Sequence, residues 1–256
     1  DGFAFNQFNA EEQSISFSPV PPPQAQGSIS GYNAGGLSPA VVNVIDKYSF
    51  VTDGNATDVG DLSQSRANVT GQSSTVSGYS SGGKLPGSVN TIDKFPFATD
   101  AGASDVGDLT QGRYGPAGQH STVSGYTSGG GHPGVNTIDK FPFATDGNAT
   151  DVGDLTRSMY QGRGQMSKTN GYTSGGVPTA SNIIDKFPFA ADANATDVGD
   201  LTQARYYAGG NSSDVSGYNA GGRVPPNVNT IDKFPFATDA NATDVGDLTF
   251  TGYPTG

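Results

Sequence analysis

The chain has 256 residues, a formal net charge of −11, no cysteine, 38 glycines and a hydrophobic fraction of 33%. This composition excludes disulfides and thiolate metal sites, and it supplies too few apolar residues for one thick core. The negative charge, with no basic stripe and no apolar run of roughly 20 residues, leads us to expect neither nucleic-acid binding nor membrane insertion.

Residues 1–27 differ from the rest of the chain. They contain Phe3, Phe5 and Phe8, followed by the proline run 21–23. We predict an N-terminal arm or linker here, and because the chain starts at Asp1 we expect a processed product or a piece of a longer one. Residues 28–256 form the predicted repeat domain, with units that start near residues 28, 75, 122, 168 and 214.

Three landmarks recur at spacings of 46 or 47 residues. The first is Gly-Tyr-x-x-Gly-Gly, which begins at Gly31, Gly78, Gly125, Gly171 and Gly217. The second is Ile-Asp-Lys, which begins at Ile45, Ile92, Ile138, Ile184 and Ile231 and continues in four units as Phe-Pro-Phe. The third is Asp-Val-Gly-Asp-Leu, which begins at Asp58, Asp105, Asp151, Asp197 and Asp244. Five complete repeat units are therefore present.

Each landmark favours a β-strand. In residues 89–97, alternation places Ile92 on one face and the aromatic pair Phe95 and Phe97 on the other. Pro96 lacks an N–H, so we expect this strand to lie at an edge or to bulge there. The Asp-, Gly- and Asn-containing stretch 52–57 favours a turn before a returning strand. The pattern predicts three or four strands per unit.

Such a unit cannot bury its aromatic face alone, so neighbouring units must supply the core. Helical repeats are disfavoured because every unit is rich in Gly and Pro and lacks a 3.6-residue apolar period. We therefore predict an all-β fold, a five-bladed β-propeller. The alternative is an open β-solenoid or prism of five repeats.

The repeat resembles that of the kelch-type propellers, which pair a strand ending in two glycines with a second strand motif and often an arginine. The matching features are the Gly pair after Tyr79, the segment 92–95, and the segment 108–113 that ends in Arg113. The resemblance covers about residues 28–250. It implies a kelch-like propeller.

A longer phrase, present for example at residues 139–156, is similar to repeats in structural proteins of tailed bacteriophages of marine and cyanobacterial hosts. It runs Asp-Lys-Phe-Pro-Phe-Ala-Thr-Asp-x-Asn-Ala-Thr-Asp-Val-Gly-Asp-Leu-Thr, and four units carry close versions of it. The resemblance implies a fibre or appendage protein at a particle surface. It names no ligand.

Three patterns are candidates for chemistry. Asp53, Asn55 and Asp58 resemble the start of a calcium loop, but the glycine and bidentate glutamate of an EF-hand are missing, so a structural turn is favoured. Asp58 and Asp61 recur in every unit, which favours a turn or a blade-to-blade ion pair over a single asymmetric active site. The two histidines, His120 and His132, have no third ligand in the sequence. We assign no catalytic residue, no metal ligand and no cofactor.

The segment between each Asp-Val-Gly-Asp-Leu and the next Gly-Tyr keeps its length but changes its content. Binding residues are commonly found in loops on a rigid scaffold, and Tyr and Arg are common contact residues. The alternative is neutral drift at an exposed loop. The candidate binding residues are Arg113, Tyr114, His120, Tyr160, Arg163, Arg205, Tyr206 and Tyr207.

These observations predict a non-enzymatic virion structural or surface-display protein, a tail or head appendage that acts in assembly or in binding a host surface. The alternative is a secreted bacterial adhesin or an extracellular filament subunit. The expected partners are other subunits of an oligomeric assembly and a host glycan. The expected location is the virion surface or the extracellular space.

Overall fold

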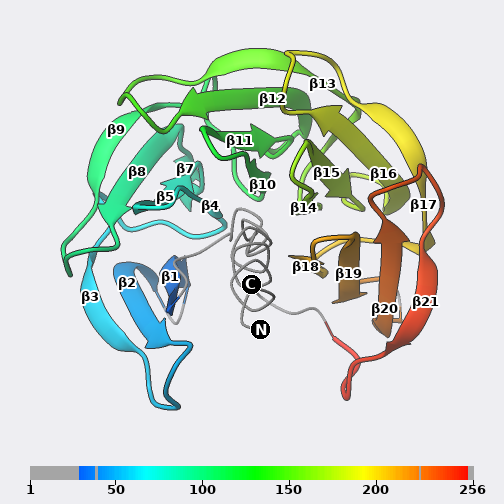
Figure 1. The fold of residues 1–256 in the computed structure, drawn as a ribbon, viewed down its shortest axis with the longest axis horizontal. Coiled ribbons are helices and arrows are strands. Elements are labelled where there is room, and N and C mark those ends of the chain that lie inside the picture. Colours follow the sequence, from blue (N-terminus) through cyan, green and yellow to red (C-terminus); the bar gives the residue numbers. More distant parts are fainter. Residues whose placement is uncertain (1–28, 38–39, 225, 253–256) are drawn as a thin grey trace, which may run out of the picture.

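The computed structural model describes residues 29–37, 40–224 and 226–252. The arm predicted for residues 1–27 lies outside them. The described residues form antiparallel sheets and no helix, so nothing in this part of the chain has the length and apolarity of a membrane-spanning helix. Five sheets surround a central axis as the blades of a β-propeller (Figure 1). The predicted fold is confirmed.

The sheets follow one another along the chain. Blade 1 comprises β1 (Ser30–Leu37), β2 (Val41–Ser49) and β3 (Thr57–Asp61). Blade 2 comprises β4 (Thr70–Ser73), β5 (Ser77–Ser81), β8 (Thr91–Pro96) and β9 (Ser104–Asp108), with the small hairpin β6 (Lys84–Leu85) and β7 (Gly87–Ser88) between β5 and β8. Blade 3 comprises β10 (Ala117–His120), β11 (Ser124–Ser128), β12 (Val135–Pro142) and β13 (Thr150–Met159). Blade 4 comprises β14 (Arg163–Met166), β15 (Asn170–Ser174), β16 (Ser181–Pro188) and β17 (Thr196–Arg205). Blade 5 comprises β18 (Gly209–Ser212), β19 (Ser216–Gly222), β20 (Val228–Pro235) and β21 (Thr243–Asp247).

Strand order within a blade runs outward from the axis (Figure 1). Blades 2 to 5 have four strands, and the described part of blade 1 has three. The innermost strands β4, β10, β14 and β18 precede the Gly-Tyr landmark. Each of the repeat units predicted to start near residues 75, 122, 168 and 214 therefore begins between the first and second strands of a blade.

Pro96 does not mark an edge strand. β8 is the third strand of blade 2 and pairs with both β5 and β9. The irregularity in the β8–β9 ladder lies between Ile92 and Asp93, and Pro96 lies beyond the last pair of that ladder, Lys94 with Ser104. The prediction of an edge or a bulge at the proline was therefore wrong, because a proline at a strand end removes no N–H that the outer ladder uses.

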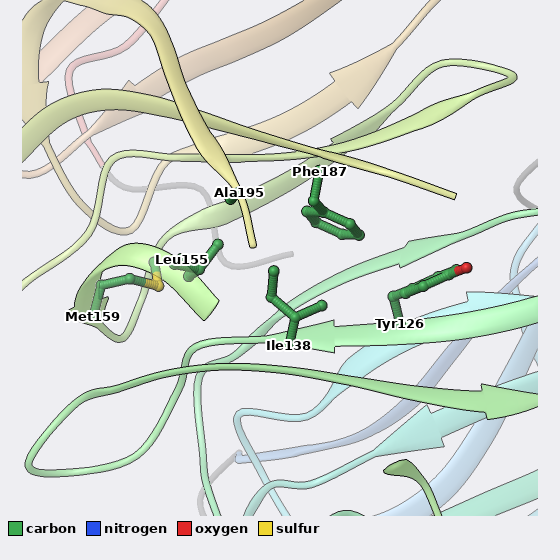
Figure 2. Packing of buried hydrophobic residues seen from close by; sticks show 6 residues of the cluster. All are labelled: Tyr126, Ile138, Leu155, Met159, Phe187 and Ala195. Carbon is green, nitrogen blue, oxygen red and sulfur yellow. The ribbon is translucent and has the colours of Figure 1, made fainter. Parts of the chain in front are cut away.

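The hydrophobic core consists of layers between consecutive blades. In the layer shown in Figure 2, Tyr126, Ile138, Leu155 and Met159 of blade 3 pack with Phe187 and Ala195 of blade 4. The equivalent layers join blades 1 and 2, blades 2 and 3, and blades 4 and 5. Burying a large apolar side chain stabilises the fold by about 1.5–3 kcal/mol, so each blade depends on its neighbour for most of its core.

The glycine of each Gly-Tyr landmark makes room for an aromatic ring. Gly78 pairs across the ladder with Phe95, and a Cβ atom on Gly78 would lie 2.3 Å from Cζ of that ring. The same holds for the other four glycines and the aromatic residues opposite them. The next residue, Tyr79, points into the following layer, where its ring stacks on Phe143 of blade 3 at 4.7 Å. This landmark therefore positions the two aromatic groups that join adjacent blades.

Candidate binding surface

The repeated acids are engaged in the scaffold. In blade 3, Asp146 pairs with Lys94 of blade 2 at 2.8 Å, and Asn148 Oδ1 accepts a hydrogen bond from the backbone N–H of Asp108. Asp151 Oδ1 accepts one from the N–H of Gly153 at the bulge in β13. These three residues are the equivalents of Asp53, Asn55 and Asp58, the candidates for calcium. Within the described ranges, no three His, Asp or Glu side chains lie together as a metal-binding group would.

The blade-to-blade ion pair predicted for the repeated acids exists, but it uses a different acid. Lys47 pairs with Asp100, the equivalent of Asp53, at 2.8 Å. Asp58 instead accepts the N–H of Gly60 at the bulge in its own strand, β3. The hydrogen bond to Asp100 raises the pKa of Lys47. The pair lies at the surface, so it contributes little to stability and mainly aligns the blades.

Two of the candidate arginines lie in the interior. Arg113 and Arg205 are 0% exposed and form ion pairs with the equally buried Asp139 and Asp232 of the following blades. Arg113 also donates to the carbonyl oxygens of Gly129 and Thr137. Burial lowers the pKa of both guanidinium groups. Their place is in the interblade scaffold, away from any ligand at the surface.

His120 is also buried. It lies at the end of β10 with 2% of its surface exposed, and neither ring nitrogen has a hydrogen-bond partner among the described residues. Burial lowers its pKa to about 4. The ring is therefore neutral at physiological pH. His132 lies elsewhere, exposed, with its ring centroid 5.5 Å from that of Tyr160.

The remaining candidates lie on connections that enter the innermost strands. A chain of backbone hydrogen bonds joins these connections: Gly115 N–H donates to Asn68, Gln161 to Gly115, and Tyr207 to Gln161, at 2.8, 2.7 and 3.2 Å. All four residues have a positive φ, between 55° and 61°. A non-glycine residue in this region costs roughly 1–2 kcal/mol, so this row of hydrogen bonds must hold Asn68, Gln161 and Tyr207 in place.

Four tyrosines lie on these hydrogen-bonded connections and form what we call the tyrosine mouth: Tyr114, Tyr160, Tyr206 and Tyr207. The rings of Tyr114 and Tyr160 meet edge to face at 6.0 Å, and those of Tyr206 and Tyr207 contact each other at 5.4 Å. Burial raises the pKa of Tyr114, and the nearby hydroxyl groups of Tyr160 and Tyr207 add to that rise. All four are half-buried, with part of each side chain facing solvent.

Cationic side chains flank the mouth. Lys84 lies over the ring of Tyr114 at 5.2 Å, and Arg223 lies over Tyr206 at 6.0 Å. Arg163 is half-buried, burial lowers the pKa of its guanidinium group, and its Nε donates to the carbonyl oxygen of Ala208. These contacts fix the ring orientations, since a cation held over an aromatic face is attracted by about 0.5–1 kcal/mol at an exposed site.

The structure thus brings together Tyr114, Tyr160, Tyr206 and Tyr207, and separates them from Arg113, Arg205 and His120. The sequence prediction missed Lys84, His132 and Arg223, which come from connections inside the blades. It also missed a constant feature within the variable segment, the Gly-Gln pair on three innermost strands. Gln119, for example, donates to Tyr172 O of the next blade at 2.8 Å. Its recurrence every 46 or 47 residues was the available signal.

Comparison with known proteins assigns no family: no protein-family model matches the chain, and no curated protein matches it.

Proposed function

We propose that the protein is a non-enzymatic binding module on the surface of a larger assembly, a tail or head appendage of a virion, and that its tyrosine mouth contacts a host-surface glycan. The observation that carries the proposal is that Tyr114, Tyr160, Tyr206 and Tyr207 lie together on one row of hydrogen-bonded connections.

Tyrosine suits this role physically. It has only two side-chain torsions, so little conformational entropy is lost when a ligand binds, and it offers both an apolar face and a hydroxyl group. A sugar ring has the matching surface, with C–H groups on its faces and hydroxyl groups at its rim. The flanking Lys84 and Arg223 add hydrogen-bond donors at the edge of the mouth.

The arrangement of the acids supports a non-enzymatic role. An acid–base or nucleophilic site needs titratable groups tuned for the reaction and directed at a shared substrate. Here Asp139 and Asp232 pair with buried arginines, while Asp146 pairs with a lysine of the adjacent blade. The placement on a virion is supported by the resemblance of the repeated phrase, for example at residues 139–156, to structural proteins of tailed bacteriophages.

A glycan array tests the binding proposal. The full chain is labelled and applied to arrayed bacterial surface polysaccharides, next to the variants Tyr160→Ala and Val123→Ala. Val123 is exposed in the β10–β11 turn, at the opposite end of β10 from the mouth, and serves as the matched control. We expect Tyr160→Ala to lose binding by tenfold or more, about 1.4 kcal/mol, and Val123→Ala to bind normally. Equal binding by both variants would contradict the proposal.

Fractionation of the native source tests the placement on a virion. The protein should sediment with tails or capsids. Recovery in phage-free extracellular filaments would instead favour the adhesin or filament alternative.

A further inference from the structure

Four interfaces between consecutive blades repeat one set of contacts. Each has a lysine paired with an aspartate of the next blade, at 2.8, 2.8, 2.9 and 2.6 Å. Each also has a tyrosine that stacks on the second phenylalanine of the next blade, with centroids 4.7 to 5.0 Å apart. In three of them, an asparagine of the next blade accepts the N–H of the last aspartate at 3.0 Å.

The fifth position differs. Figure 1 shows the arc of blades open between β21 of blade 5 and β3 of blade 1, which we call the seam. Among residues 29–37, 40–224 and 226–252, no hydrogen bond, ion pair or aromatic contact joins blade 5 to blade 1. Tyr48 and Phe50 of blade 1 are 39% and 53% exposed, whereas the equivalent Phe95 of blade 2 is 5% exposed.

Each side of the seam carries one half of the repeated contact set. Blade 5 presents Tyr218 and Lys233, together with the free N–H side of Asp247, and all three equivalents bind the next blade elsewhere. Blade 1 presents the receiving residues Tyr48, Phe50, Asp53, Asn55 and Asp46. Asp46 is half-buried, whereas its equivalents Asp93, Asp139 and Asp232 are 0% exposed and paired with arginines.

The angle between adjacent blades is fixed by close backbone contact. A Cβ atom on Gly107 would lie 2.4 Å from the carbonyl oxygen of Gly147 in the next blade, and Gly60, Gly153 and Gly199 are equally tight, at 2.5 to 2.6 Å. Direct closure of blade 5 onto blade 1 would require all four of these contacts to change. Gly246, the equivalent glycine at the seam, has no atom within 4 Å of the same Cβ position. The seam is therefore a vacant interface of the established kind.

We propose that the seam binds one further blade of this same repeat, which completes the ring. Toward blade 5 this blade presents the aromatic pair, the aspartate and the asparagine. Toward blade 1 it presents a tyrosine, a lysine and a buried arginine for Asp46. Opposite charges then meet on both sides, Lys233 with the added aspartate and the added lysine with Asp53.

The repeat of blade 4 has this chemistry on both faces. Tyr172, Lys186 and Arg205 face the following blade, and Phe189 and Asp192 face the preceding one. Blade 5 has Gly252 where other blades have the arginine; both residues accept a hydrogen bond from the second glycine of their blade's Gly pair. The interface between blades 3 and 4 has Met159 at that position and still forms, so the arginine is dispensable on one side.

Cross-linking tests the proposal in the full chain, which has no other cysteine. The Asp53→Cys variant is mixed with a synthetic peptide of residues 162–208 that carries Lys186→Cys, and a short bismaleimide is added. We expect a one-to-one adduct. The control adds Lys233→Glu to the chain: Lys233 forms no ion pair within the described residues, but a carboxylate there would face Asp192 of the added blade, so the yield should fall about tenfold. No adduct, or an adduct that Lys233→Glu leaves unchanged, would overturn the proposal.

A duplication of residues 162–208 within the chain supplies the added blade covalently and removes any dependence on peptide folding. The pair Lys233→Cys and Asp53→Cys should then stay unlinked in the five-repeat chain. In the six-repeat chain, the inserted repeat follows blade 4, so blade 5 becomes the sixth blade and its Lys233→Cys should link internally to Asp53→Cys. An internal link in the five-repeat chain would mean that the ring closes unaided. A link between two five-repeat chains would mean that a second copy occupies the seam. Either result, or an unlinked six-repeat chain, overturns the proposal, whatever the mouth binds.

Discussion

The interblade layer and the tyrosine mouth differ in how strictly their residues are repeated from one unit to the next. In the layer, equivalent positions hold the same residue and make the same contact, as with Tyr79, Tyr126 and Tyr172. In the mouth, the equivalent positions with a positive φ hold four different residues, Asn68, Gly115, Gln161 and Tyr207, and the position before them holds Ala67 in the first unit and tyrosine in the next three. A contact between copies of one unit restricts both partners, whereas a side chain facing solvent is restricted only by its ligand. Variation between repeats therefore marks positions that are free of the scaffold contacts, whereas identity alone does not separate scaffold from mouth, since Tyr114, Tyr160 and Tyr206 recur at one repeat position.

The largest expected effect breaks the scaffold. Asp139→Ala leaves the guanidinium of Arg113 buried and without its charge partner, which costs about 3–5 kcal/mol of unfolding free energy. Urea denaturation of the full chain measures it. The matched control is Asp192→Ala, which breaks the exposed Lys140–Asp192 pair and should cost less than about 1 kcal/mol. Similar losses in the two variants would show that burial does not distinguish these pairs.

The next effect depends on pH and on His120. Its pKa is about 4 in the folded protein, against 6.5 when the chain is unfolded. The unfolded chain therefore binds more protons between these values, so the neutral, buried form contributes stability above pH 6.5 that is lost as the pH falls toward 4, by at most about 3 kcal/mol. His120→Met carries the residue of the equivalent position in blade 4, Met166, and should remove this part of the acid sensitivity. Unchanged acid sensitivity in urea melts between pH 7 and pH 4 would disprove it.

A smaller effect concerns the backbone conformation of Gln161, beside the tyrosine mouth. Gln161 has a φ of 58°, and a glycine there would relieve the backbone strain. Gln161→Gly should therefore change the unfolding free energy by less than about 1 kcal/mol in either direction, since relieved strain and added chain entropy offset each other. If the mouth needs the rigid row of hydrogen-bonded connections, glycan binding should weaken while the unfolding free energy stays the same. A loss of several kcal/mol of unfolding free energy, measured by thermal denaturation, would assign these connections to the scaffold instead.

The aromatic alternation was predictable from the sequence, because the faces of Ile92 and Phe95 follow from the two-residue period of a strand. The starting point of each blade was not, since the innermost strands are short polar segments such as β4 with no apolar alternation. The sequence also placed Arg113 and Tyr114 in one candidate surface because they are neighbours. In the structure the two side chains lie apart, because Arg113 is buried against Asp139 and Tyr114 contacts Tyr160 in the mouth.

One measurement tests the separation of scaffold and recognition surface most directly. Glycan binding and urea unfolding are measured on the same samples of the full chain, of Tyr114→Ala with Tyr160→Ala, and of Asp192→Ala. We expect the tyrosine variant to lose binding while its unfolding free energy changes by less than about 1 kcal/mol, and Asp192→Ala to bind as the native chain does. Loss of binding in proportion to loss of stability across all variants would contradict the account.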